Sequence, residues 1–535
     1  MDFSVISKMN DLTNTIGHII DKHNWVIGGQ NFDEDVHFSS FYIRLSSKKY
    51  LGTKAKTGYR TIISTYDNFN ETYYIPKSEC ETVAKYLLKR IKGQPEWMND
   101  IIMKIYRRCT ALSRVFDKFK NNSDFSDLSE RQIIALYEKH FSAHWKLYEI
   151  ARIPEALDRG TEIFTDYLKC YLRKKYKKDR TEEINELFYR LTTPEKPSIF
   201  QEESFNFSEI VKDIEKNPSQ KALFINPNKK LSLNANPIIL KRIDGHREKW
   251  GYLDYHGYTH RELPNFEHYV ERINACLRHG SPWKSKNEYS KLAHEASVEK
   301  ERIYSKHNVD RKHQEIFALY WKIGLAKLFR RLIQLKNFFF LDKLIYQIAL
   351  RKGCEENIIR CLLPEEIENL LQQKLSIDKV IAKRLEFIVY IINGKQEKIL
   401  GGIDNRWVKE KLDQKVKSLG TATNELRGSP AYLGYARGIC KVIIRPYDAV
   451  TKSFRNGEII VSESTNPDFT DLIAKSGGVV TQQGGVTCHA AIICRELGKP
   501  AIVGVRNLLN TIKDYDEIIL DAYSGKLSIL RKSLG

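Results

Sequence analysis

Residues 477–501 constrain the fold more than any other part of this chain. The short apolar run Gly478–Thr481 is followed by the paired glycines Gly484 and Gly485, and then by a helical pattern that stops at Gly498. A strand, a glycine loop and a helix in this order are typical of an α/β layer. The pattern therefore predicts a compact α/β domain in the C-terminal part of the chain.

His489 is expected in the first turn of this helix, with Thr487 as the N-cap. The free backbone N–H groups of a first turn and the helix dipole favour an anion at that place. A neutral imidazole is also a competent nucleophile at physiological pH. The residues alone leave two interpretations open: a nucleophile that becomes phosphorylated, or a histidine packed at an ordinary strand–loop–helix turn.

The C-terminal domain is expected to span residues 421–535, after a flexible linker at 416–430 that is rich in glycine and polar residues. Short β-rich runs alternate there with turns and one or two helices. These runs are Ile439–Ile444, Glu458–Val461, Gly478–Thr481, Ala501–Val505, Glu517–Leu520 and Lys526–Leu530.

The rest of the chain predicts two further regions. Residues 1–105 are mixed α/β, with strand-like runs such as Phe41–Leu45, and residues 106–415 are mainly helical. In the helical region, Ser129 and Gln132 are spaced as a capping box, and apolar periodicity continues through Ile377–Ile392. The sequence as a whole predicts a multidomain α+β protein with a compact β/β/α-type domain at its C-terminal end.

Composition excludes several classes of protein. Apolar residues make up 42% and aromatic residues 11%, which are globular values, and no apolar stretch is long enough to span a bilayer. The N-terminus has no apolar core of signal-peptide length. The nine cysteines are scattered without a CxxC pair, so we expect reduced thiols in a cytoplasmic protein and no metal site.

The net charge is +20, of which residues 421–535 hold +3 and the first 420 residues +17. Such an excess attracts polyanions, although a basic solvated surface explains it equally well. Basic runs at 172–178 and 327–331 carry no recognised nucleic-acid motif, and nucleic acid is not an expected partner.

The segment GGVTCHAAIICRELGKPAIVG and its flanks resemble the phosphohistidine swivelling domain of phosphoenolpyruvate-utilising enzymes. That group includes phosphoenolpyruvate synthase, pyruvate phosphate dikinase and rifampicin phosphotransferase. The resemblance implies that His489 is phosphorylated, that Thr487 orients imidazole or phosphate, and that Gly484, Gly485 and Cys488 form the phosphate-binding loop. Arg495 and Glu496 match family positions, and a structural ion pair on the helix is expected for them. Residues 481–483 depart from the family, which often has an acidic residue there.

The resemblance does not extend to a phosphoryl source. The chain ends 46 residues after His489, so no phosphoenolpyruvate-binding barrel is expected to follow. No GxxxxGK[S/T] loop and no complete ATP-grasp module are recognisable upstream. No cofactor is therefore expected on this chain, and Mg²⁺ with ATP or phosphoenolpyruvate is expected only through a partner.

The helical region carries a weaker resemblance. Residues 250–258 and 352–368 are similar to the region that precedes the histidine domain in rifampicin-phosphotransferase-like proteins, where it helps to form an acceptor pocket. The candidate pocket residues are Tyr255, His256, Tyr258 and His260. An aromatic-rich core turn is the alternative interpretation.

The function implied by the resemblance is a phosphotransferase. His489 takes a phosphoryl group from a separate donor protein or domain and passes it to a small-molecule acceptor held by the helical region. The alternative is a non-catalytic binding or regulatory protein that has retained the domain as a scaffold.

Overall fold

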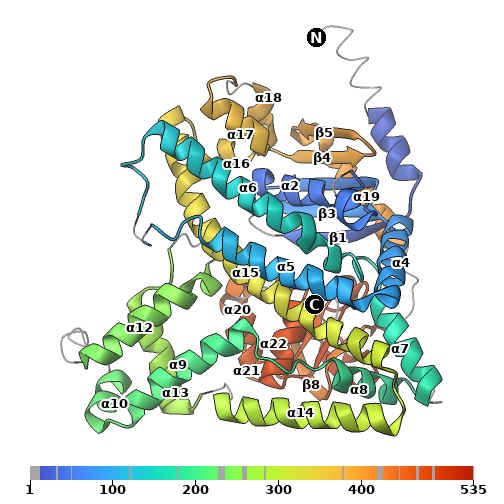
Figure 1. The fold of residues 1–535 in the computed structure, drawn as a ribbon, viewed down its shortest axis with the longest axis vertical. Coiled ribbons are helices and arrows are strands. Elements are labelled where there is room, and N and C mark those ends of the chain that lie inside the picture. The colour runs from blue at the N-terminus through green and yellow to red at the C-terminus, as the bar shows by residue number, and fades with distance from the viewer. Residues whose placement is uncertain are drawn as a thin grey trace. The chain divides into compact units, whose positions relative to one another are not determined.

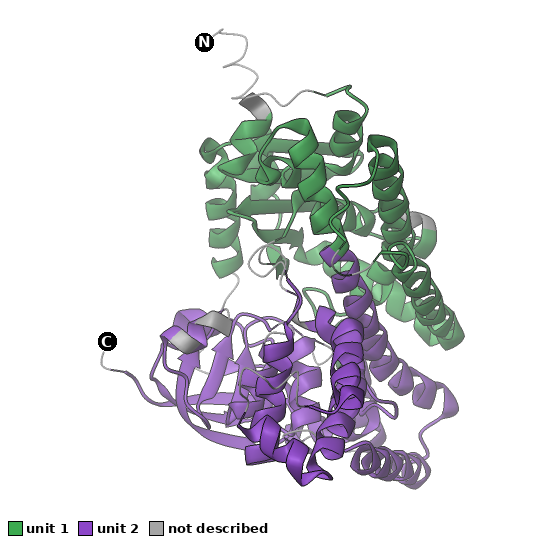
Figure 2. Ribbon diagram, turned by 90° about the vertical axis from the view of Figure 1, so that its left-hand side faces the viewer, with its two compact units in different colours: residues 1–166, 340–422 green, residues 167–339, 423–535 purple. Residues whose placement is uncertain are grey.

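The fold is seen in a computed structural model, whose helices and strands are labelled in Figure 1. The described residues are 13–31, 34–49, 51–119, 121, 123–176, 180–226, 235–255, 262–281, 285–375, 379–418, 426–444, 446–465, 469–484 and 488–533. They form two compact units, which Figure 2 colours separately. Residues 1–166 and 340–422 belong to unit 1, and residues 167–339 and 423–535 belong to unit 2.

Unit 1 contains an antiparallel sheet of five strands in the order β1-β3-β2-β4-β5. The strands are β1 (Trp25–Asn31), β2 (Thr61–Asp67), β3 (Asn70–Pro76), β4 (Ile388–Asn393) and β5 (Gln396–Gly401). The helices are α2 (Val36–Ser46), α3 (Leu51–Ala55), α4 (Lys77–Gly93), α5 (Pro95–Ser113), α6 (Glu130–Glu155), α16 (Glu356–Arg360), α17 (Pro364–Leu371), α18 (Lys379–Ala382) and α19 (Arg406–Ser418). All five strands share a hydrophobic core with α19, to which Ile63, Tyr74, Val389 and Leu412 contribute.

Unit 2 combines helices with a mixed sheet of eight strands in the order β6-β13-β12-β8-β9-β10-β11-β7. Strands β8 to β11 run parallel to one another. β7 and β12 pair antiparallel at the two sides of this group, and β13 and β6 continue the antiparallel pairing beyond β12. The strands are β6 (Leu426–Arg427), β7 (Ser429–Tyr432), β8 (Tyr435–Val442), β9 (Ile459–Ser462), β10 (Gly478–Thr481), β11 (Ala501–Val503), β12 (Glu517–Asp521) and β13 (Lys526–Arg531). Each of the six β-rich runs predicted in residues 421–535 overlaps one of these strands.

The helices of unit 2 come from both of its stretches. They are α8 (Thr181–Thr192), α9 (Ile199–Glu215), α10 (Pro218–Ile225), α12 (Pro237–Trp250), α13 (Phe266–His279), α14 (Lys286–Lys306), α20 (Pro446–Thr451), α21 (Thr470–Lys475), α22 (His489–Leu497) and α23 (Leu508–Thr511). Two long helices, α7 (Ile163–Tyr176) and α15 (Arg311–Lys352), each contain a boundary between the units. The predicted α+β composition is confirmed, while the domain limits at 105, 415 and 430 stay predictions.

Two local predictions are wrong. The run Phe41–Leu45, predicted as a strand, lies in α2, all of whose residues are buried. A short apolar run that is buried on every side carries no periodicity that distinguishes a strand from a helix. The helical pattern predicted through Ile377–Ile392 ends in β4, which pairs with β2 and turns into β5 at Gly394. The φ of +65° at Gly394 suits the tight hairpin turn.

Unit 1 also buries a cluster of charges around Arg360, which is 1% exposed. Its Nη1 donates hydrogen bonds to both carboxylate oxygens of Asp35, at 3.0 and 2.8 Å, and to Oδ1 of Asp342 at 2.8 Å. Its Nη2 also donates to Glu356. Burial raises the pKa of Asp35 to about 7, against the lowering effect of Arg360. The guanidinium therefore offsets the free-energy cost of burying three acidic side chains in unit 1.

We expect Arg360→Met to lower the free energy of unfolding by about 3–5 kcal/mol, because it leaves buried carboxylates without a cation. Urea denaturation followed by circular dichroism measures the loss. Arg108→Met, on an exposed position of α5, is the matched control and should change stability by less than about 0.5 kcal/mol. Equal effects of the two substitutions would contradict this account of the cluster.

Candidate functional site

His489 is the first residue of α22, which follows β10 after a loop. The helix ends at Gly498, where a φ of +66° gives the left-handed cap that glycine adopts without strain. The predicted start and end of this helix are thus confirmed. The N-cap, however, is Cys488 with extended backbone angles, and its side chain makes no capping hydrogen bond. Thr487, predicted as the N-cap, lies outside the described residues.

The loop before α22 is described in part. Gly484 has a φ of +103°, and a Cβ added there would lie 2.8 Å from Sγ of Cys488. This close approach requires glycine. Gly485 lies outside the described residues, so a phosphate-binding role for Gly484, Gly485 and Cys488 stays a prediction.

The imidazole of His489 is contacted within unit 2 by Thr465, which follows strand β9, and by Phe200 of α9. Its Nδ1 lies 3.0 Å from Oγ1 of Thr465, and its ring meets that of Phe200 edge-on with centroids 5.5 Å apart. Nε2 is buried and has no hydrogen-bond partner among the described residues. Burial, with a smaller effect of the Arg331 charge, lowers the pKa of His489 to about 3. The ring is therefore neutral at physiological pH, with one nitrogen held and the other bare, as a nucleophile requires.

Helix α15 places positive charge beside the first turn of α22. Arg331 acts on the pKa of His489, and Lys327, one helical turn earlier, acts on that of Cys488. The two helices approach closely at Gly324, where an added Cβ would lie 3.9 Å from Cδ1 of Ile492. These cations reinforce the positive end of the α22 dipole. The surroundings of His489 thus disfavour a proton on the imidazole and favour an anion beside it.

The C-terminal half of α22 contacts α8, α9 and strand β7. Oγ of Ser198, the N-cap of α9, donates a hydrogen bond to Oε1 of Glu496. Burial raises the pKa of Glu496 to about 8, against the lowering effect of this bond. Arg495 donates from Nε to the carbonyl of Ala431 at 2.8 Å and lies over the ring of Tyr189. The ion pair expected between Arg495 and Glu496 is not among the ion pairs of the described residues.

The acceptor pocket predicted at residues 255–260 is described only at Tyr255. Its side chain is buried and contacts Phe339, with ring centroids 5.5 Å apart. His256, Tyr258 and His260 lie outside the described residues, so this pocket stays a prediction. In the described part of the chain, no group of three or more acidic, histidine or cysteine side chains is arranged to hold a metal ion. No helix described here is long and apolar enough to cross a membrane.

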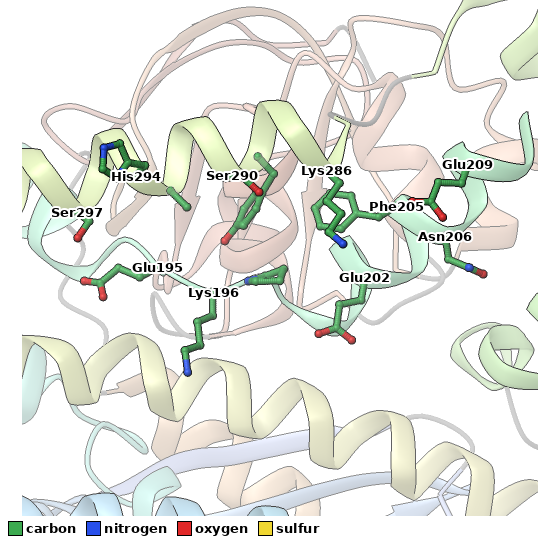
Figure 3. Close-up of a pocket in the computed structure, with 13 residues that line it drawn as sticks. Glu195, Lys196, Glu202, Phe205, Asn206, Glu209, Lys286, Ser290, His294 and Ser297 are labelled. Carbon is green, nitrogen blue, oxygen red and sulfur yellow. The ribbon is translucent and has the colours of Figure 1, made fainter. Parts of the chain in front are cut away.

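A groove of about 770 Å³ lies elsewhere in unit 2, between α9 and α14 (Figure 3). Its lining residues are Glu195, Lys196, Pro197, Glu202, Phe205, Asn206, Glu209, Lys286, Tyr289, Ser290, Ala293, His294 and Ser297. None of them was singled out from the sequence, because charged and aromatic residues at helical spacing are typical of any solvated helix face.

Other contacts of the site were also missed. Thr465 follows strand β9 and was noted only for its resemblance to a turn of the family. Ser198 is spaced with Gln201 as a capping box, but this local signal does not reveal that Ser198 and Phe200 contact α22. Arg331 was noted only within a basic run. The spacing of residues along one helix does not reveal which distant helix it will face.

Comparison with known proteins confirms the resemblance of the C-terminal segment. Residues 454–525 match the family described as PEP-utilising enzyme, mobile domain. A probable phosphoenolpyruvate synthase of Staphylothermus marinus is 33% identical over 183 residues, which are 31% of this chain and 22% of that protein. A rifampicin phosphotransferase of Bacillus cereus is 34% identical over 121 residues, 23% of this chain and 14% of that protein.

A phosphoenolpyruvate synthase of Aeropyrum pernix is 37% identical over 100 residues, 19% of this chain and 12% of that protein. The chain thus matches less than a quarter of the length of each of these three relatives. Over the matched residues it is similar to phosphotransferases of the phosphoenolpyruvate synthase and rifampicin phosphotransferase type.

The burial of Glu496 generates a prediction about pH. Its pKa is about 8 in the folded protein and 4.5 ordinarily, so between these values the folded state holds a proton that the unfolded chain has lost. Stability should therefore fall as pH rises through this range, by less than about 1.4 kcal/mol per pH unit. The lowered pKa of His489 produces an opposing slope only below its ordinary value of 6.5. Asp35, with a pKa of about 7, contributes a slope of the same sign up to about that pH. The window from pH 7 to 8 therefore reports mainly on Glu496.

Glu496→Gln should flatten the dependence of the unfolding free energy on pH within this window, because glutamine does not ionise. Urea denaturation at several pH values measures the slope. The control Glu182→Gln, at an exposed position of α8, should show the same slope as the unmodified protein. An unchanged slope in Glu496→Gln would show that this carboxyl is not buried as described.

Proposed function

We propose that this protein is a phosphotransferase in which His489 carries a phosphoryl group from a separate donor module to an acceptor held by the helices of unit 2. The observation that carries the proposal is the bare Nε2 of a neutral, buried imidazole at a helix N-terminus. The match of residues 454–525 to the mobile-domain family supports it.

The hydrogen bond to Thr465 is compatible with the tautomer that this chemistry needs. With its proton on Nδ1, the imidazole donates to Oγ1 of Thr465, and Nε2 carries the lone pair. Nε2 attacks the phosphorus of the donor; the P–N bond forms and the bond from phosphorus to the donor's leaving group breaks. An acceptor hydroxyl then attacks the same phosphorus, the P–N electrons return to Nε2, and the hydroxyl proton passes to a base or to water.

The observed packing of α22 suits the second of these steps. The ring of Phe200 meets that of His489 edge-on, and the charge of Arg331 acts on the imidazole that would carry the phosphoryl group. Exclusion of water and fixed positive charge are the main requirements of phosphoryl transfer. In this packing, α22 faces the helices that would hold the acceptor.

The first step requires a different arrangement. A donor cannot reach Nε2 while that atom is buried, so α22 must separate from α9 and α15 during loading. We propose that the C-terminal domain moves as a body for this purpose. Of the linker predicted at 416–430, residues 419–425 lie outside the described residues. The proposal assigns ATP or phosphoenolpyruvate, with Mg²⁺, to the donor module.

His489→Ala should abolish the phosphorylated form and leave the fold intact. Intact-mass spectrometry after incubation with ATP or phosphoenolpyruvate, with and without candidate donor proteins, measures the adduct. The adduct should be acid-labile and base-stable, as a phosphoramidate is. His279→Ala, at an exposed position of α13, is the matched control and should keep the adduct. An adduct of unchanged yield on His489→Ala would overturn the proposal.

Arg331→Gln should slow transfer to the acceptor by about 10- to 100-fold, because removing one charge-stabilising contact costs roughly 1.4–3 kcal/mol of barrier. Loading of His489 from the donor should change much less, since α15 is displaced in that step. Rapid-quench measurement of each half-reaction separates the two effects. Arg311→Gln, at a side chain 92% exposed on the same helix, is the control. Equal slowing of both steps would contradict this assignment of Arg331.

A further inference from the structure

The groove between α9 and α14 takes one face from each helix (Figure 3). Glu202, Phe205, Asn206 and Glu209 recur at intervals of three and four along α9. The residues from α14 follow the same spacing: Lys286, Tyr289, Ser290, Ala293, His294 and Ser297. Two helices that turn such faces toward a common space form a concave site of the size that small ligands occupy.

A buried hydrogen-bond chain fixes the position of Asn206 in this groove. Oδ1 of Asn206 lies 2.8 Å from Nδ1 of His246, whose Nε2 lies 2.9 Å from Oε1 of Glu203. Arg272 donates from Nη2 to the same carboxylate oxygen at 3.1 Å. His246 is 2% exposed and Glu203 8%. Because His246 engages Oδ1, the amide N–H groups of Asn206, a residue that lines the groove, can donate to a ligand.

Aromatic rings form the apolar part of the groove. Phe205 of α9 and Tyr289 of α14 lie with centroids 5.6 Å apart. Burial raises the pKa of Tyr289, so its phenol keeps its proton and can donate a hydrogen bond. A ring-shaped ligand could therefore rest its apolar face on these side chains while its polar edge meets their neighbours.

The charged groups of the groove nearly balance. Glu195 is already paired with Lys300 at 2.8 Å. The remaining charged lining residues are two acidic ones, Glu202 and Glu209, and two basic ones, Lys196 and Lys286; His294 also lines the groove. A site of no net charge does not select an ion of either sign. Carboxylates that accept, with ammonium and amide groups that donate, match the alternating hydroxyls of a polyol.

The groove also lies close to α22, the helix that begins at His489. Pro197 lines the groove, and the next residue, Ser198, donates a hydrogen bond from Oγ to Oε1 of Glu496. Glu496 and His489 are seven residues apart on α22, which places them on one side of the helix about 10 Å apart. A ligand that extends from the groove along α22 would therefore bring a hydroxyl toward His489.

We infer that this groove is the acceptor site and that it binds a neutral, polyhydroxylated ring compound such as a sugar or a glycoside. The inference deepens the proposed function and rests on it for the role of the ligand as acceptor. Binding itself requires neither a donor nor a phosphorylated histidine, so it can be tested separately.

Ligand-observed NMR on the full chain tests the inference with three sets of probes: neutral sugars and their phenyl glycosides, aromatic amines, and aromatic carboxylates. Neutral glycosides should bind in preference to the charged aromatic probes. Absence of glycoside binding, or binding by the charged probes alone, would overturn the inference.

Titration calorimetry with the best glycoside then localises the site. Asn206→Ala and Glu209→Gln should each weaken binding at least 10-fold, and Asn287→Ala, outside the groove on α14, should not. Circular dichroism establishes that each variant is folded. Equal binding by all variants would place the glycoside elsewhere and overturn the assignment.

His489→Ala should bind the glycoside as the unmodified protein does, because the histidine is not part of the groove. If the unmodified protein binds no glycoside but His489 still becomes phosphorylated, the assignment of the acceptor site is wrong and the proposed carrier role stands. If the protein binds the glycoside but His489 never becomes phosphorylated, the proposed carrier role is wrong and the protein is a binding protein.

Discussion

The burial of an uncharged imidazole at the start of α22 is the constraint on which the rest of the site depends. Placing His489 beneath Phe200 and beside Arg331 makes a proton on the ring costly. The hydrogen bond between Nδ1 and Thr465 then fixes the ring without occupying Nε2. The helix dipole and the nearby cations disfavour a proton on the ring, but they favour the negative charge of a phosphoryl group bound to it. The same contacts therefore keep the nucleophile neutral and stabilise its phosphorylated form.

Helix α9 connects this carrier site to the groove. Its first residues contact α22 through Ser198 and Phe200, and the following turns line the groove with Phe205 and Asn206. A single helix thus positions both the covered imidazole and the amide that a ligand would meet. The buried chain through His246 ties α9 to α12 and α13, so that these positions are held by the core of the unit.

The sequence predicted the C-terminal sheet and the limits of α22 well, because alternation, glycine loops and a left-handed cap at Gly498 are local signals. It failed at the α2 run Phe41–Leu45 and at β4, where burial on both sides or pairing with a distant strand decides the outcome. At the site, the motif singled out His489 but not Thr465 or Arg331. Their roles arise from tertiary contacts between elements, which no spacing within one segment encodes.

The position of the phosphoryl group on His489 tests the central claim most directly. Long-range ¹H–¹⁵N correlation NMR of protein labelled at histidine distinguishes the two ring nitrogens and reports the charge of the ring. After donor-driven phosphorylation, the account predicts a P–N bond at Nε2, and before it a neutral imidazole protonated at Nδ1 near pH 7. A phosphoryl group on Nδ1, or a His489 ring that is cationic at pH 7 before loading, would contradict it.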